Sequence, residues 1–453
     1  MSRNDNALPA AAGPPRTASK GHEPDGKFPA IPFLTIGTQE ASHDRPRRTP
    51  LKRTLALGGV AAGLLATALV SQPASADSDV SSDPLANGTA AYNVAAFWLG
   101  NQAENLVAAT PYNVETTVVA KHVSTGGPAA DSKPGVIPAI GDEKKSTSTS
   151  KNVNLPKSTG KVFFTVPDGS DADTKPDARW CSATSIQSTY RNLVATAGHC
   201  VYDTVTNKTT LDQWVFVPGY YQGKVPWGLY VGKQAFTHYD FDVYEDGDRD
   251  YAFVTVYNGI KYVPRPGEAS TPFVPSTNDA DWREVSKAVY DNPGIWKNFK
   301  KEENGKYFLR KFTDAGRLGD NVGGQGLAYN QKLGKATFVF GYPSGSHPDG
   351  NYAYSGKTLK WSYGKTFAAS AASRKAEELI GIKSSFTGQG SLGSSWLAGY
   401  KNTRRLGYLN GVTSAVSDTD GNNRIDTSVS PYFDGETYGV YSAAKNIWSG
   451  SIA

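Results

Sequence analysis

Short apolar, β-branched and aromatic segments recur along the last two-thirds of the chain, each bounded by glycine, proline or polar turn residues. The sequence has 47 glycines and 27 prolines but a single methionine. Many short strands with few long helical periods indicate an all-β sandwich or barrel. The stretch 159–453 is long enough for two small barrels, each with its own core. The clearest strand-like segments are 160–166, 193–196, 213–217, 252–256, 336–341 and 409–416.

The first 76 residues have the composition of a leader with an export signal. Basic residues at 45–53 precede an apolar run at 55–70, and Ala-Ser-Ala at 74–76 offers a cleavage site before Asp77. This order is typical of a secretory signal peptide. A membrane anchor is disfavoured, because the apolar run is short for a span and three glycines interrupt it. We therefore expect a secreted, extracellular protein with no membrane anchor after cleavage.

The excess of basic residues lies mostly in this leader. The whole chain has a formal charge of +5, and residues 1–76 contain nine basic and five acidic side chains. The rest of the chain is close to neutral and has no electrostatic footprint for nucleic acid. We expect no nucleic-acid partner, and a monomer.

Residues 77–158 combine a helical pattern with a linker-like composition. The stretch 92–109 predicts one amphipathic helix, ended by the Thr-Pro pair at 110–111. Residues 123–158 are rich in Ser, Thr, Lys, Gly and Pro, which is typical of a flexible linker. A helix and a linker ahead of a folded domain at 159–453 indicate a pro-segment, although a disordered spacer fits the composition equally well.

The sequence contains two cysteines, Cys181 and Cys200. In an exported protein each has one available partner, and a disulfide across this separation would stabilise the fold by roughly 3 kcal/mol. The alternative is two buried free thiols. His199 directly precedes Cys200, in the run Thr-Ala-Gly-His-Cys. Small residues before the histidine let the backbone turn tightly, and a disulfide beside it would hold the imidazole in place, as a general base requires.

This run resembles the histidine motif of the chymotrypsin/trypsin-like serine proteases, and Cys181 lies where that family's histidine-loop disulfide begins. The resemblance implies two six-stranded Greek-key β-barrels followed by a short C-terminal helix. It also implies polypeptide substrates, a Ser-His-Asp triad with His199 as the base, and no cofactor. The stretches 317–326 and 340–343 resemble the second barrel of secreted bacterial members similar to glutamyl endopeptidases.

Asp250 resembles the aspartate of the same family. It opens the run Asp-Tyr-Ala-Phe-Val, at the mouth of an apolar strand, and lies between His199 and the serine region. In this chemistry a buried carboxylate orients the histidine ring and stabilises the imidazolium. The acidic loop just before it, 240–248, fits a solvated turn.

The serine region departs from the family pattern. Residues 387–396 read TGQGSLGSSW, where related enzymes have Gly-x-Ser-Gly-Gly-Pro. Anchored on the Thr-Gly at its start, the nucleophile falls on Ser391. Anchored on Trp396, it falls on Leu392, which cannot attack a carbonyl. Ser394 is a third candidate, and we take Ser391 as the predicted nucleophile while the register stays open.

The resemblance also assigns the groups around that nucleophile. The backbone N–H groups of Gln389, Gly390 and Ser391 would form the oxyanion hole, a turn that needs permissive glycine geometry. The substrate would lie against the strand ending at Thr413 and Ser414, with Ser385 near the pocket. Neither a pocket aspartate nor a histidine near this strand is present to set a preference.

Two functional classes follow. The first is a secreted serine endopeptidase that hydrolyses peptide bonds through an acyl-enzyme, with His199 taking the proton of Ser391. The alternative is an inactive pseudoprotease that serves as an extracellular binding module. Leu392 is the sequence feature that separates the two.

Two further segments have no role in either functional class. For residues 281–312 we predict an insertion on the surface. An acidic turn partly resembles a calcium loop, but it lacks the sharp-turn glycine and the bidentate glutamate, so a plain polar turn is the alternative. Its candidate ligands are Asp418, Asp420, Asn422 and Asp426.

Overall fold

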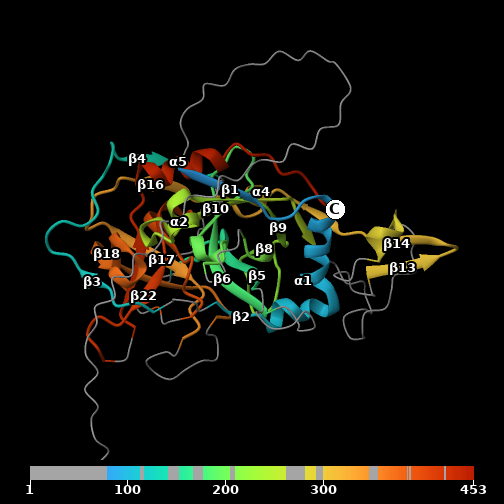
Figure 1. The fold of residues 1–453 in the computed structure, drawn as a ribbon, viewed down its shortest axis with the longest axis horizontal. Helices are drawn as coiled ribbons and strands as arrows, with labels where there is room; N and C mark the ends of the chain where they lie inside the picture. The colour runs from blue at the N-terminus through green and yellow to red at the C-terminus, as the bar shows by residue number, and fades with distance from the viewer. Residues whose placement is uncertain are drawn as a thin grey trace, which may run out of the picture. The chain divides into compact units, whose positions relative to one another are not determined.

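The first barrel is a closed ring of six antiparallel strands. Its members in chain order are β5 (Thr159–Val166), β6 (Asp177–Ile186), β7 (Leu193–Thr196), β8 (Asp212–Pro218), β9 (Tyr230–His238) and β10 (Ala252–Val256). They pair in the order β5-β6-β7-β10-β9-β8, and β8 pairs with β5 to close the ring. This is the green part of Figure 1.

The fold is known from a computed structural model. It describes residues 79–112, 117–140, 153–166, 177–204, 210–261, 281–291, 299–345, 356–384, 386, 389–422 and 425–453. The predicted export signal lies outside these residues. Within them, no helix is long and apolar enough to cross a membrane.

Strand β5 shows how the first barrel is stabilised. Successive side chains on a strand point to opposite faces. Val162 and Phe164 therefore pack inside the barrel with residues such as Phe216. Phe163 points the other way, into a second apolar cluster that also contains Trp98. Because both faces of the strand are buried, three apolar residues follow one another at 162–164 instead of alternating with polar ones.

The second barrel has the same order of strand pairing as the first. Its strands are β17 (Ala336–Gly341), β18 (Lys360–Ala371), β19 (Ala376–Lys383), β20 (Ser395–Lys401), β21 (Leu406–Val412) and β23 (Thr427–Pro431). The pairing order is β23-β19-β18-β17-β20-β21. Ser414 N donates to Val429 O at 2.9 Å and Val412 N donates to Ser430 Oγ at 2.9 Å, which brings β21 against β23.

In both rings the first strand pairs with the second and fourth, and the third pairs with the sixth. The two predicted six-stranded Greek-key barrels are therefore confirmed. The short C-terminal helix is confirmed as well. It is α5 (Gly435–Ala444), whose N-terminus is fixed by a capping box between Asp434 and Thr437.

The described residues between 79 and 140 lie along both barrels (Figure 1). The predicted helix is confirmed as α1 (Gly88–Ala108), and it places Trp98 against Phe163. On the first barrel, β1 (Val80–Pro84) pairs with β9, and β2 (Thr110–Pro111) pairs in parallel with β6. On the second, β3 (Lys121–His122) pairs with β18, and β4 (Gly135–Ile137) pairs with β16 (Gly326–Tyr329), a neighbour of β21.

These pairings bear on the linker predicted from composition. Part of the stretch 123–158 forms β4, which is hydrogen-bonded to the folded body, while residues 141–152 lie outside the described residues. The domain boundary at residue 159 stays a prediction. The described part of 79–140 nevertheless packs as an integral layer, because its strands pair with β9 and β6 of the first barrel, with β18 of the second, and with β16 beside it.

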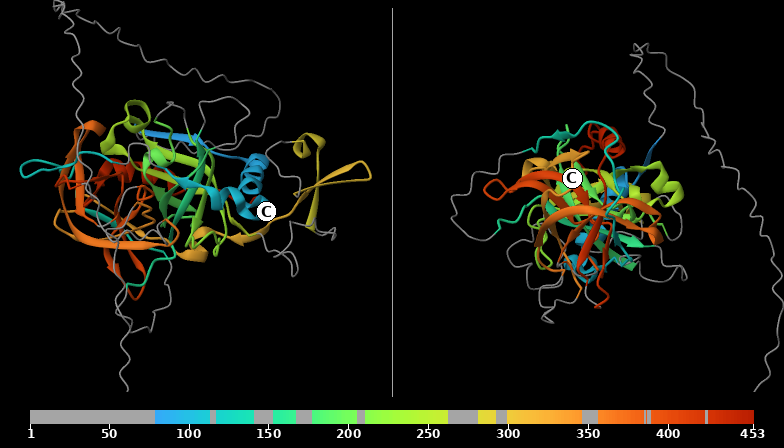
Figure 2. Two further views of the ribbon diagram at one scale, coloured as in Figure 1. Left: turned by 90° about the horizontal axis from the view of Figure 1, so that it is seen from below. Right: turned by 90° about the vertical axis from the view of Figure 1, so that its left-hand side faces the viewer.

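The segment 281–312 forms a small sheet of its own. Its strands are β12 (Trp282–Val285), β13 (Lys300–Glu303) and β14 (Lys306–Arg310). They pair in the order β12-β14-β13 and not with either barrel. In Figure 1 and in the left view of Figure 2 the β13–β14 hairpin stands away from the barrels. Leu309 and Phe312, however, are buried in the same apolar cluster as Trp98, so the segment is anchored to the folded body and a surface insertion stays a prediction.

Candidate active site

The histidine loop follows directly from β7. The strand ends at Thr196, and Gly198–Cys200 forms a short 3-10 turn that carries His199. The disulfide between Cys181 and Cys200 is confirmed. Gly198 is required here because a Cβ would lie 2.6 Å from the ring of Phe241. The turn and the disulfide together fix the imidazole, and the His199 side chain is only 3% exposed.

Asp250 holds both the ring and the main chain of His199. It lies between a 3-10 turn, Gly247–Arg249, and strand β10, and is fully buried. Its Oδ2 is 2.7 Å from His199 Nδ1, and its Oδ1 accepts the His199 backbone N–H at 3.0 Å. The structure therefore brings together the histidine and the aspartate that the sequence singles out.

Asp250 has two further partners that the sequence did not reveal. The guanidinium of Arg374 donates to Oδ2 at 3.0 Å, and the hydroxyl of Ser414 donates to the same oxygen. Burial alone would raise the pKa of Asp250. The charge and hydrogen bond of His199, then Arg374 and Ser414, outweigh burial and hold that pKa well below its usual range. Arg374 comes from a turn 124 residues further along the chain, and no local motif marks it.

The predicted nucleophile is not joined to this pair. Ser391 Oγ, Ser394 Oγ and His199 Nε2 are all buried, and none has a hydrogen-bond partner among the described residues. Nε2 is the ring nitrogen that would accept a nucleophile's proton, and no hydroxyl of the described residues is hydrogen-bonded to it. The predicted acid and base are in contact, while no hydrogen bond joins Ser391 to either of them among the described residues.

The turn that carries the serine candidates is nevertheless regular. Gly390 and Gly393 have φ values of +80° and +74°, which favour glycine. Ser182 N donates to Leu392 O at 2.8 Å, and Gly393 N donates to Thr413 O at 2.8 Å. The backbone of the turn is thus anchored to both barrels.

Leu392 occupies the centre of this turn. Its side chain is fully buried in the interior cluster of the first barrel, which also contains Ala197 and Cys200 from the histidine loop. Leu392 therefore belongs to the same buried apolar cluster as two residues of the histidine loop. This is the residue that the register anchored on Trp396 puts in the nucleophile's place.

An aromatic ring from the N-terminal segment covers the imidazole. Tyr112 follows β2 and is held there by its N–H, which donates to Trp180 O at 2.9 Å. Its ring stacks on His199 with 6.1 Å between centroids and an interplanar angle of 27°. Sequence reasoning missed this contact because Tyr112 precedes the histidine by almost ninety residues, in a segment interpreted as a pro-segment or spacer.

The other predicted site residues have varied surroundings. Ser385 lies outside the described residues. Thr413 accepts the indole N–H of Trp396 at 3.0 Å, and Ser414 donates to Asp250, so both hydroxyls already have protein partners. In the predicted oxyanion turn, Gln389 O accepts both the N–H and the hydroxyl of Ser344, at 2.8 and 2.7 Å.

The acidic turn predicted as a partial calcium loop is internally hydrogen-bonded. Asp426 accepts from Lys383 Nζ at 2.8 Å, and Asp418 accepts the N–H of Gly421 at 2.9 Å. Across the residues that the structure describes, no group of three or more His, Cys, Asp or Glu side chains could hold a metal ion. Calcium binding by Asp418, Asp420, Asn422 and Asp426 stays a prediction.

Solved structures similar to this chain are bacterial and other microbial serine proteases. The protease Anisep from Arthrobacter nicotinovorans is 22% identical, with a TM-score of 0.43, over 65% of this chain and 98% of its own. The thermostable serine protease AL20 from an extremophilic microorganism is 20% identical, with a TM-score of 0.42, over 64% and 98%. A Glu endopeptidase is 16% identical, with a TM-score of 0.37, over 67% and 98%. No protein-family model and no curated protein matches the sequence.

Proposed function

We propose that this chain is an extracellular binding module built on a trypsin-like double barrel, and that it does not hydrolyse peptide bonds. The observation that carries this proposal is the buried Nε2 of His199, which has no hydroxyl partner among the described residues. Acyl transfer needs a nucleophile within hydrogen-bond reach of its base. Tyr112 stacks on the imidazole, and the side chain of Leu392 is buried in the same apolar cluster as Ala197 and Cys200 of the histidine loop.

Arg374 supports the same conclusion electrostatically. In a working triad the aspartate stabilises the imidazolium that forms when the histidine takes the proton. Here the guanidinium of Arg374 contacts the same carboxylate oxygen as the His199 ring. The carboxylate that would have to stabilise an imidazolium is therefore already paired with a fixed positive charge.

A latent endopeptidase is the second candidate, because the hydrogen bond between Asp250 and His199 is intact at 2.7 Å. In this candidate the segment that carries Tyr112 is displaced and Ser391 approaches His199. The base then takes the Ser391 proton, the alkoxide attacks the substrate carbonyl, and the acyl-enzyme is hydrolysed by water. Ser391 Oγ supports this candidate because it too is buried without a partner in the described structure.

Labelling by a fluorophosphonate, with mass mapping of the adduct, separates the two candidates. The probe is applied to the whole chain and to Tyr112→Ala, which uncovers the imidazole, with trypsin labelled in parallel as a positive control. The proposal predicts no serine adduct on either form. An adduct on Ser391 that His199→Ala abolishes would replace the binding module with the latent peptidase.

Export is part of the proposal. It rests on the signal-like order at 45–77 of the sequence and on the disulfide between Cys181 and Cys200, which persists in oxidising compartments. N-terminal sequencing of protein collected from the culture medium tests it. A chain that begins at Asp77 is expected, and a chain retained in the reducing cytoplasm would refute export.

A further inference from the structure

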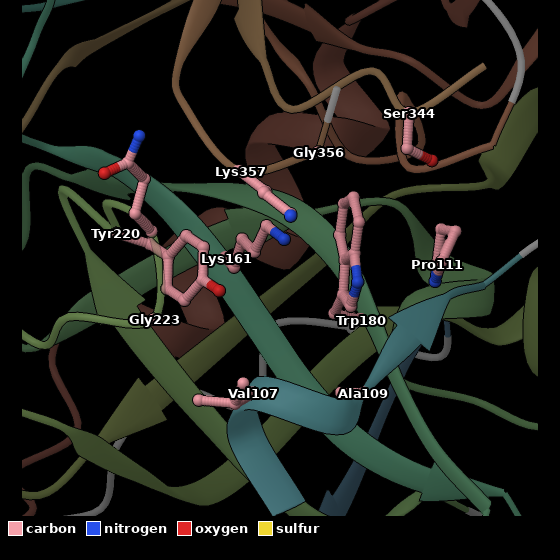
Figure 3. A pocket seen from close by; sticks show the side chains of 11 residues that line it. Val107, Ala109, Pro111, Lys161, Trp180, Tyr220, Gly223, Ser344, Gly356 and Lys357 are labelled. Atoms are coloured by element: carbon pink, nitrogen blue, oxygen red, sulfur yellow. The ribbon is translucent and has the colours of Figure 1, made fainter. Parts of the chain in front are cut away.

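A cavity of about 430 Å³ lies next to the candidate active site. Its walls come from the end of α1 and β2, from the first barrel, and from the loop after β17 in the second barrel (Figure 3). The ring of Trp180 connects the cavity to the turn described above, because a Cβ on Gly390 would strike it. A volume of this size suits a small organic ligand.

Lys161 is the unusual residue of this cavity. It lies on β5 and points out of the barrel, yet the side chain is only 2% exposed. Its Nζ is 3.2 Å from the ring centroid of Trp180, 4.4 Å from that of Tyr220 and 5.4 Å from that of Tyr342. No described residue forms an ion pair with it.

Burial without a counter-ion is costly for an ammonium group. Aromatic faces attract a cation, but a cation–π contact contributes less than the cost of burying an isolated charge. Burial accordingly lowers the pKa of Lys161 well below that of an exposed lysine. A negative charge placed in the cavity would restore the ammonium form.

The remaining wall is also basic. Lys357 lines the cavity, and in Figure 3 its amine and that of Lys161 point into the space between Tyr220 and Trp180. None of the lining residues within the described part of the chain is acidic. Two amines beside two aromatic rings complement an anion that has an apolar body.

We propose that this cavity binds the carboxylate of a small organic anion, such as the C-terminus of a peptide. The carboxylate pairs with the amines of Lys161 and Lys357, and the adjoining apolar group lies against Trp180 and Tyr220. The inference goes beyond the proposed function and does not depend on whether the neighbouring site hydrolyses anything. It holds for a binding module and for a latent peptidase alike.

Proton linkage gives the site a distinctive signature. In the unliganded protein, burial favours the neutral amine of Lys161. A bound carboxylate favours the ammonium, so binding takes up a proton and weakens as the pH rises. A surface lysine that merely attracts anions would take up no proton near neutral pH.

Isothermal titration of the whole chain tests the proposal. The probes are N-acetyl-alanyl-phenylalanine as the free acid, its C-terminal amide, and inorganic phosphate. We expect the free acid to bind at least tenfold more tightly than the amide, with proton uptake revealed by buffers of different ionisation enthalpy. Equal affinity for acid and amide would overturn the carboxylate site, and tighter binding of phosphate would reassign it to phosphate groups.

Three variants locate the binding. Lys161→Met keeps the volume and removes the charge, and should weaken the free acid at least tenfold and abolish proton uptake, whereas Lys161→Arg should retain binding. Lys157→Met is the matched control, because Lys157 Nζ lies 4.6 Å over the ring of Trp227, outside the cavity. Thermal melting confirms that each variant is folded. Unchanged affinity in folded Lys161→Met would refute the proposal.

Discussion

Replacing Asp250 by asparagine should destabilise the fold far more than its size suggests. The carboxylate accepts from the His199 backbone, the His199 ring and Arg374 at 3.0, 2.7 and 3.0 Å, and also from Ser414, in a site where Asp250 is fully buried. An amide has one acceptor oxygen and turns an NH₂ group toward these donors. Breaking a buried ion pair from one side costs about 3–5 kcal/mol, and we expect Asp250→Asn to lose that much free energy of unfolding.

The pH dependence gives an independent check on this loss. The folded-state pKa of Asp250 is lowered, so its contribution is complete above the ordinary aspartate value of about 3.9 and is lost as the pH falls through the folded value. The difference between wild type and Asp250→Asn should therefore be constant from neutral pH down to about pH 4 and shrink in stronger acid.

Urea unfolding followed by fluorescence measures both effects. The matched control is Asp177→Asn, which removes an aspartate paired with Arg179 at 2.6 Å on the surface, where Asp177 is 42% exposed. Such an exposed pair contributes less than about 1 kcal/mol. If Asp250→Asn loses no more stability than Asp177→Asn, the buried carboxylate is not the electrostatic centre that the geometry implies.

Three other variants test separate parts of the fold by the same unfolding assay. Replacing both Cys181 and Cys200 by alanine should cost about 3 kcal/mol, because the nineteen-residue separation is no longer closed in the unfolded chain; reducing agent should then leave the variant's stability unchanged. Trp98→Ala should cost about 3–5 kcal/mol if α1 is integral to the fold, and a loss under 1 kcal/mol would mean that the helix merely rests on the barrel. Burial raises the pKa of Asp248 to about 6, so the folded protein binds this proton more tightly than the unfolded chain does. The free energy of unfolding should therefore decrease as the pH rises from about 4 to about 6. Asp248→Asn should lack this decrease, and a profile identical to that of the wild type would contradict the assignment.

Local sequence patterns predicted most of the strands of the fold and, in the site, the histidine and the aspartate. Strand-like runs between turn residues identify β7, β10 and β17 to the residue, because alternation and burial act within a few positions. The histidine loop is recognisable for the same reason, since His199, its disulfide and the small residues before it are neighbours in sequence. The aspartate follows from chain order and from the apolar strand behind it.

Contacts between residues far apart in the sequence could not be predicted from local patterns. Arg374 and Tyr112 meet Asp250 and His199 only because strand pairing folds remote parts of the chain together. The serine region stayed ambiguous because a single inserted or lost residue shifts the register by one, which moves the predicted nucleophile between Ser391 and Leu392. Lys161 reads as an ordinary strand residue until the aromatic rings around it are placed.

The edge pairing of the N-terminal segment has a consequence for maturation. Its strands hydrogen-bond to β9 and β6 of one barrel, to β18 of the other, and to β16, the neighbour of β21. A single cut after residue 140 would therefore sever the backbone without freeing the fragment, and the two pieces should co-elute on a sizing column until denaturant separates them. Cleavage of the chain and dissociation of the N-terminal fragment are therefore separate steps, and any activation that depends on losing the fragment also requires its strand pairs to be broken.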